Sequence, residues 1–165
     1  MTHKVIDQFF RRAVERDYSV LRYNMRGIGQ STGSYDKGIG EEQDLQNLIQ
    51  WIRGQKISIS QMVLVGYSFG SWLTAKVAAK SPSPCVLIAP PVSLYSFPVL
   101  DSNLHKIVFS AGQDTLIPQE KIQAYVETIS EPKTHLSIEK ADHYFIGTTT
   151  ELIRSVFQTL DQTVL

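Results

Sequence analysis

Three residues in this sequence have the chemistry of a serine nucleophile and its two partners. Ser68 stands in the pattern Gly-x-Ser-x-Gly, directly after a short apolar run, and Asp114 and His143 follow later in the chain. A serine hydroxyl is a weak nucleophile at neutral pH, so it needs a base within hydrogen-bond reach and a third group that orients the base. A histidine titrates near neutral pH, and a buried carboxylate fixes its tautomer. The residue types therefore predict Ser68 as nucleophile, His143 as base and Asp114 as the acid.

The glycines on either side of the serine favour a sharp turn from a strand to a helix, the nucleophile elbow. Gly66 and Gly70 each lie two residues from Ser68. A turn of this kind holds its central residue in a strained backbone conformation, and we expect side chains at both flanking positions to collide with the neighbouring strand and helix. It also places the serine oxygen at a helix amino terminus, where free N–H groups favour developing negative charge.

The elements that must position these residues alternate between apolar strands and amphipathic helices. The expected strands span residues 19–24, 62–66, 85–89, 106–111 and 134–138, and the expected helices include an opening helix around residues 6–14, one around 45–52, then 69–80 and 118–129, and a final helix around 152–160. This order predicts an α/β fold, a mostly parallel sheet with helices on both faces. Ser68, Asp114 and His143 each then follow a strand, at the edge of the sheet where reactive groups gather.

Each feature has an ordinary explanation when it is taken alone. Gly-x-Ser-x-Gly can be a mere strand-to-helix turn, Asp114 can cap a helix before Pro118, and His143 can be a loop histidine. Because all three follow successive strands in the order Ser, Asp, His, the catalytic interpretation is favoured. The remaining histidines, His3, His105 and His135, are interpreted as structural or solvated.

Composition and charge narrow the class of protein. The chain has 165 residues, of which 42% are hydrophobic, so we expect a single domain over residues 1–165. Sixteen basic residues balance sixteen acidic ones, and no basic run interleaves with aromatic residues. We therefore expect a small-molecule substrate and no nucleic-acid or membrane partner, while the oligomeric state stays open. No signal sequence is evident, which favours a cytoplasmic protein.

The chemistry that these residues suggest requires neither a metal nor an organic cofactor. The single cysteine, Cys85, cannot form an intrachain disulfide and lies in the apolar run CVLIAP. We interpret it as a buried strand residue, because a reactive thiol needs an exposed, electropositive setting.

With those residues placed, the chain resembles the α/β-hydrolase superfamily, and within it the small lidless bacterial hydrolases similar to dienelactone hydrolases. The segments that carry the resemblance are RYNMRGIGQSTGSYDKGIGEEQD, VGYSFGS, GQDTLIP and ADHYF, and the match covers nearly the whole chain. The resemblance implies the roles of nucleophile, acid and base given above. It also implies that Phe69 offers the first N–H of the oxyanion hole, and that the segment around Arg26, Gly27 and Gly29 shapes a turn beside the site.

The start of the chain departs from the family pattern. Such hydrolases carry up to three strands before the first helix expected here, and the loop after the third supplies the second oxyanion donor. We therefore expect a fold that is incomplete at the N-terminus, through a misassigned start or a truncated gene. In the family the third strand lies between 19–24 and 62–66, and leaving ~6 buried backbone groups unpaired at ~1 to 3 kcal/mol each would consume most of a domain's ~5 to 15 kcal/mol of stability. Direct pairing of the two strands, a contribution from another chain and poor folding of the chain alone are the three alternatives.

The leading functional hypothesis is hydrolysis of a small ester or related acyl compound through an acyl-serine intermediate. The stretch between residues 90 and 106 is too short for a lid domain, so we expect an open, shallow site. Leu94, Tyr95 and Phe97 fit an apolar wall there, although an ordinary packed loop is the favoured interpretation. Two alternatives remain: a non-catalytic, truncated hydrolase-like protein that lacks half of its oxyanion hole, and a serine peptidase of the same superfamily.

Overall fold

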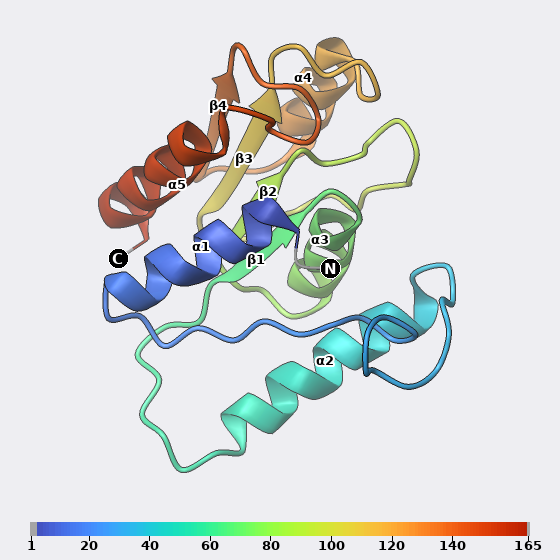
Figure 1. The fold of residues 1–165 in the computed structure, drawn as a ribbon, viewed down its shortest axis with the longest axis vertical. Helices are drawn as coiled ribbons and strands as arrows, with labels where there is room; N and C mark the ends of the chain where they lie inside the picture. The colour runs from blue at the N-terminus through green and yellow to red at the C-terminus, as the bar shows by residue number, and fades with distance from the viewer. Residues whose placement is uncertain (1–2, 165) are drawn as a thin grey trace.

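A computed structural model of the chain, which describes residues 3–164, shows a parallel β-sheet between two layers of helices (Figure 1). Over these residues the sheet has four strands in the order β1-β2-β3-β4, the order in which they occur along the chain. Their bounds are β1 (Leu64–Tyr67), β2 (Cys85–Ile88), β3 (Lys106–Ala111) and β4 (Lys133–Ile138). Every pair of neighbours is parallel, so the carboxyl ends of all four strands lie along the same edge of the sheet.

The helices cover both faces of this sheet. On one face lie α1 (Lys4–Glu15) and α5 (Thr149–Thr163), and on the other lie α3 (Phe69–Lys80) and α4 (Gln119–Thr128). The remaining helix, α2 (Ile39–Arg53), packs against α3, on the side away from β3 and β4 (Figure 1). The predicted α/β class and the absence of a lid domain are confirmed, because the described segment between β2 and β3 contains turns but no helix or strand.

The position of the central strands between two helix layers explains why their sequences are continuously apolar. In β2, Val86 and Ile88 face α1 and α5, while Cys85 and Leu87 face α3 and α4. All four side chains are buried. A strand with a helix layer on each side has no solvent face, so both of its alternating positions must be apolar. Burial raises the pKa of the Cys85 thiol to about 12, which agrees with the interpretation of this cysteine as a core residue.

The prediction of a strand over residues 19–24 is wrong. This segment is extended and largely exposed, but it forms no ladder, and β1 pairs with β2 alone among the described residues. Side chains hold the segment instead: the Arg22 Nη1 group donates to Asp7 Oδ1 at 2.9 Å, and its guanidinium lies 4.4 Å from the centre of the Phe10 ring, so both contacts are with α1. A strand needs a neighbour at ~4.8 Å, and without one the extended backbone remains solvated. Direct pairing of 19–24 with the strand before Ser68, one of the three alternatives, therefore does not occur.

The glycine-rich segment after it forms a turn that is fixed to α2. Arg26 donates to both carboxylate oxygens of Asp44, at 2.7 and 2.8 Å. The next residue, Gly27, has φ +73°, and a Cβ there would approach the carbonyl oxygen of Gly33 to 3.2 Å. Arg26 and Gly27 therefore shape the turn, as the sequence predicts for this segment.

Candidate active site

The turn from β1 into α3 presents Ser68 at the carboxyl edge of the sheet. Ser68 has φ +50° and ψ −122°, a conformation that is strained for a residue with a side chain. Hydrogen bonds to the backbone N–H and carbonyl of Ser68 hold it there. Its N–H donates to the carbonyl of Ile88 at 2.9 Å, and its carbonyl accepts from the N–H and the hydroxyl of Ser71 at 2.8 and 2.6 Å. The strain is therefore fixed by contacts with β2 and α3.

The two glycines of the motif differ in how much space they leave. A Cβ on Gly66 would overlap the carbonyl group of Gly70 and lie 2.5 Å from Thr74 Oγ1. A Cβ on Gly70 would only touch Met25 Cε at 3.8 Å, an ordinary van der Waals contact. The expected collision thus exists at Gly66 and is absent at Gly70, since the second glycine faces the turn that carries Met25 rather than the backbone of a neighbouring element.

Asp114 lies in the loop after β3, and its side chain is fully buried. Its Oδ1 atom accepts hydrogen bonds from the N–H groups of Leu116 at 2.8 Å and Ile117 at 2.9 Å. Its Oδ2 atom lies 2.7 Å from Nδ1 of His143. Since α4 begins only at Gln119, Asp114 orders its own loop and does not cap that helix.

His143 lies in the loop after β4 and connects the other two side chains. Its Nε2 atom lies 2.9 Å from the Ser68 hydroxyl oxygen, while Nδ1 faces Asp114. Its backbone is anchored too, because the Tyr67 hydroxyl donates to the His143 carbonyl at 2.9 Å. With a proton on Nδ1 donated to the carboxylate, Nε2 is free to accept from the serine. The structure thus brings Ser68, His143 and Asp114 together in one chain of hydrogen bonds, and their catalytic roles stay predictions.

The predicted oxyanion donor lies directly after the serine. Phe69 is the first residue of α3, so its N–H has no acceptor one helical turn earlier within the helix. The positive end of the helix dipole is located at the same place. This position suits a group that stabilises negative charge near the Ser68 oxygen, and the role of Phe69 in an oxyanion hole likewise stays a prediction.

The other three histidines make structural contacts. His105 Nε2 lies 2.9 Å from Thr134 Oγ1, and His135 Nε2 lies 3.0 Å from Ser110 Oγ. His3 accepts a hydrogen bond from the Val5 N–H on its Nδ1 and so caps α1. Its ring lies 4.5 Å from that of Tyr67, beside the site. Burial, and then the nearby His143, lower the pKa of His3.

Sequence reasoning missed a group of aromatic side chains beside the serine. The Phe69 ring has three aromatic neighbours with ring centres 5.6–5.8 Å away, namely Tyr35, Trp72 and Tyr95. Of the three residues considered for an apolar wall, Tyr95 belongs to this group. Phe97 instead packs on Tyr125 at 5.0 Å, and Leu94 is exposed. No local sequence pattern predicts this group, since its members come from three separate segments of the chain.

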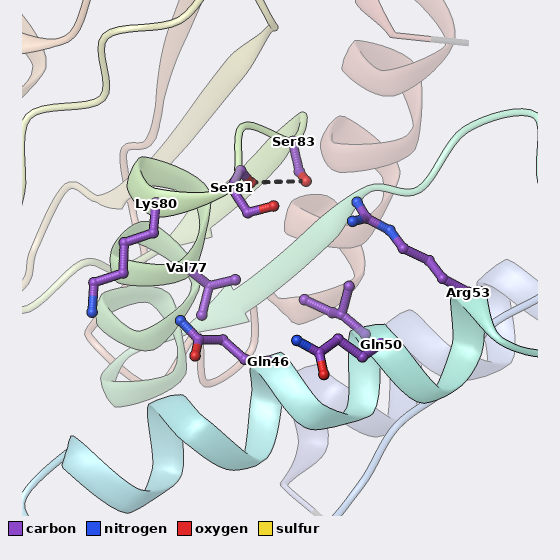
Figure 2. A pocket seen from close by; sticks show the side chains of 8 residues that line it. Gln46, Gln50, Arg53, Val77, Lys80, Ser81 and Ser83 are labelled. Atoms are coloured by element: carbon purple, nitrogen blue, oxygen red, sulfur yellow. Dashed lines mark hydrogen bonds between the residues drawn. The ribbon is translucent and has the colours of Figure 1, made fainter.

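The cavity in Figure 2 lies away from these residues. It measures about 280 Å³ and is bounded by α2 and by the C-terminal end of α3, where Val77 and Ser83 line it. Ser68 precedes the first turn of α3, and Val77 and Lys80 lie in its last turns, so about 14 to 18 Å along the helix separates Ser68 from these two residues. This cavity is therefore separate from the candidate active site.

Two features of residues 3–164 bear on the expected partners. No three His, Cys, Asp or Glu side chains within this range gather closely enough to hold a metal ion. None of the helices in the same range combines the length and the apolar character that a membrane crossing needs.

Comparison with known families identifies the chain. Residues 2–112 match the family model described as X-Pro dipeptidyl-peptidase (S15 family). The chain belongs to this family of α/β-hydrolases. The matched range includes Ser68 and ends before Asp114 and His143.

Solved structures extend the likeness of this α/β-hydrolase over nearly its whole length. An α/β serine hydrolase homologue from Coxiella burnetii is 32% identical, with a TM-score of 0.85 over 97% of this chain and 77% of the other. A serine hydrolase without a lid from Xanthomonas campestris is 26% identical, with a TM-score of 0.90 over 98% of this chain and 74% of the other. An uncharacterised protein of Rickettsia prowazekii (strain Madrid E) is 26% identical over 94% of this chain and 70% of its own length.

Proposed function

We propose that this α/β-hydrolase cleaves small esters or related acyl compounds through an acyl-serine intermediate. The observation that carries the proposal is the continuous chain of hydrogen bonds from Ser68 through His143 to Asp114, with distances of 2.9 and 2.7 Å. These distances are within the range that proton transfer between a nucleophile and its base requires. The proposal also draws support from the relatives described as serine hydrolases.

The acylation step follows from this geometry. His143 Nε2 takes the proton of the Ser68 hydroxyl while the serine oxygen forms a bond to the carbonyl carbon of the substrate. The carbonyl oxygen becomes an oxyanion, which the N–H of Phe69 at the start of α3 stabilises. When the bond to the leaving group breaks, the leaving group accepts the proton from Nε2, and an ester of Ser68 remains.

The deacylation step repeats this sequence with water. His143 removes a proton from a water molecule that attacks the acyl carbon, and then returns the proton to the Ser68 oxygen as the acid product is released. Asp114 accepts the Nδ1–H hydrogen bond throughout and stabilises the imidazolium ion in both steps.

The family model favours a second candidate, a serine peptidase. Its description names X-Pro dipeptidyl-peptidases, which act on peptides. The steps for an amide are the same as for an ester, but the amine that leaves is a poorer leaving group and depends more on protonation by His143. A substrate comparison therefore separates the two candidates.

The first experiment tests for an activated serine. Purified protein and a Ser68→Ala variant are incubated with a fluorophosphonate probe, and labelling is read by intact mass. We expect one adduct per wild-type chain and none on Ser68→Ala, while Ser93→Ala, which removes an exposed serine from the loop after β2, labels like wild type. Equal labelling of wild type and Ser68→Ala, or no labelling of either, contradicts the proposal and favours a non-catalytic protein.

The second experiment compares 4-nitrophenyl acetate with an Xaa-Pro 4-nitroanilide at equal concentrations. For each substrate, kcat/KM is divided by the rate constant of uncatalysed hydrolysis, which corrects for the greater chemical reactivity of the ester. An esterase should show the larger ratio for the ester. A larger rate enhancement for the anilide would favour the peptidase instead.

A further inference from the structure

We propose that the aromatic group beside Ser68 is the acyl-binding surface of this hydrolase and selects esters of aryl-substituted acids. This inference rests on the proposed function and names its substrate class. The group is defined by Tyr35, Phe69, Trp72 and Tyr95 and is called the aromatic platform below. Its central ring belongs to the residue that directly follows the nucleophile.

The first argument is the side of the serine on which the platform lies. The rings next to the His143 imidazole are those of Tyr67 and Tyr144, with centres 6.0 and 5.4 Å away. The platform is built on α3, the turn before α2 and the loop after β2. His143 instead follows β4, which is the outer strand on the side of the sheet away from β1 (Figure 1). Because His143 protonates the leaving group, the leaving group departs on its side. The acyl group, which stays bound to Ser68, then extends toward the platform.

The second argument is that the platform is preorganised. Trp72 stacks on Tyr95 with ring centres 4.5 Å apart and an angle of 22°, and its Nε1–H donates to the carbonyl of Ser96 at 2.9 Å. A Cβ on Gly38 would overlap the Trp72 ring, so the turn before α2 is pressed against the indole. A surface whose rings are already fixed loses little conformational entropy when a ligand binds.

The third argument is its charge. A cation lies against the platform: the Nζ atom of Lys76 is 4.6 Å from the Trp72 ring centre, and this ammonium is paired with Glu42 at 2.6 Å. A tyrosine hydroxyl is neutral at physiological pH, and burial, and then the neighbouring Tyr35, raise the pKa of Tyr95 above its usual value. The platform therefore offers neutral rings to the substrate, which favours a neutral acyl group over an anionic one.

The fourth argument concerns aromatic rather than aliphatic acyl groups. Tyr35 is 60% exposed, and its ring is tilted 59° from that of Phe69, 5.8 Å away. The Tyr95 ring meets Phe69 edge to face. A further ring placed against this arrangement gains the edge-to-face contacts that aromatic pairs prefer, in addition to the area it buries. An aryl-acetyl group that is attached to the Ser68 oxygen is of a size that can reach the neighbouring Phe69 ring.

The test uses three substrates with one leaving group: the 4-nitrophenyl esters of phenylacetic, cyclohexylacetic and acetic acid. The first two differ in aromaticity and little in size, so the ratio of their kcat/KM values isolates the aromatic contribution. We expect wild type to favour phenylacetate over cyclohexylacetate by about 2- to 10-fold, which corresponds to the usual strength of an aromatic pair.

Three variants locate this preference. Tyr35→Ala is expected to lower the ratio at least 2-fold, and Tyr35→Phe, which keeps the ring, to retain it. Tyr144→Ala is the matched control on the His143 side, since Tyr144 is 54% exposed, and it should change both esters by the same factor. A wild-type ratio near 1 with normal acetate hydrolysis, or an equal fall in Tyr144→Ala, overturns the inference and leaves the proposed function standing. No hydrolysis of any of the three esters overturns the proposed function itself.

Discussion

Asp114 uses its two carboxylate oxygens for two purposes. Oδ1 accepts from the backbone N–H groups of Leu116 and Ile117, so it orders the loop, while Oδ2 faces Nδ1 of His143. The neighbouring loop is tied to it by a further hydrogen bond, from the Gln113 N–H to the Ala141 carbonyl at 2.8 Å. Loop order and imidazole orientation can therefore be separated by changing one oxygen of the carboxylate and keeping the other.

The Asp114→Asn substitution makes this separation. The amide oxygen can still accept the two loop hydrogen bonds, but the amide NH₂ group cannot accept from Nδ1–H, so His143 loses the tautomer that activates Ser68. We predict that the rate of fluorophosphonate labelling falls on the order of 10⁴-fold while the melting temperature changes little. Stopped-time labelling and a thermal melt measure the two quantities.

Asp142 provides the matched control for this prediction. Its Oδ1 atom accepts from the N–H groups of Tyr144 and Ile146, and it stands next to His143 in the chain without contacting the imidazole. Asp142→Asn removes the same charge and should keep labelling within about 10-fold of wild type, since solvent and salt screen the Coulomb effect of a partly exposed charge. If both variants lose labelling equally, the special role of Asp114 is refuted.

At the scale of elements, the β1–α3 turn depends on one glycine more than on the other. Gly66→Ala places a Cβ against the Gly70 carbonyl and Thr74, which are fixed parts of α3. We predict that it lowers the free energy of unfolding by about 1–3 kcal/mol and slows labelling of Ser68. Gly70→Ala is helical and uncrowded, and it should leave stability unchanged or raise it by up to about 1 kcal/mol. Urea denaturation of both variants measures the difference, and equal destabilisation would contradict it.

The contact between α1 and α5 is expected to contribute strongly to stability. Phe157 on α5 is almost fully buried and stacks on Phe9 of α1 with ring centres 5.1 Å apart. The Phe157→Ala substitution should lower the free energy of unfolding by about 3–5 kcal/mol, as measured in urea. Val14→Ala shortens a 53% exposed side chain of α1 and should change the free energy of unfolding by less than about 0.5 kcal/mol. A loss below about 1 kcal/mol for Phe157→Ala would show that α1 and α5 are only loosely packed.

Most elements could be predicted because their signals are local. The helix over 69–80 and the strand over 106–111 appear with the bounds that the sequence predicts, since one follows the elbow motif and the other is a continuous apolar run. The segment over 19–24 also contains apolar and aromatic residues, Val20, Leu21 and Tyr23, yet it is no strand. A strand exists only if another segment pairs with it, and that condition cannot be read from the segment itself.

The candidate site likewise has a part that the sequence predicts and a part that it does not. Ser68, Asp114 and His143 could be placed because each follows a strand that the sequence marks. The support of His143 by the Tyr67 hydroxyl could not, because it joins side chain and backbone across 76 positions of the chain. Contacts of this kind depend on how the loops pack once the sheet has formed, and single-sequence patterns carry no information on it.

At the scale of the whole molecule, three histidines link stability to pH. His3, His105 and His135 all have a pKa below the usual value, with burial as the first cause in each case. For His105 the neighbouring Lys106 lowers the pKa further. The folded chain therefore binds fewer protons than the unfolded chain when the pH falls below about 6.5, the value for an unperturbed histidine. Stability contributed by the neutral rings is fully present above that pH and is lost as the pH falls.

We predict that the melting temperature is nearly constant from pH 7.5 to about pH 6.5 and falls between about pH 6.5 and pH 5.5, because there the unfolded chain binds protons that the folded chain does not bind. Carboxylates with lowered pKa values, such as Asp44, lose their contribution only at more acidic pH, so the range isolates the histidines. His135→Gln tests the assignment at one position: burial is the only cause of the His135 shift, and a glutamine can still reach the Ser110 hydroxyl. The variant should show a shallower fall over the same range in a scanning fluorimetry series. A melting temperature that rises toward pH 5.5, or an unchanged slope in His135→Gln, would mean that these rings are charged in the folded chain.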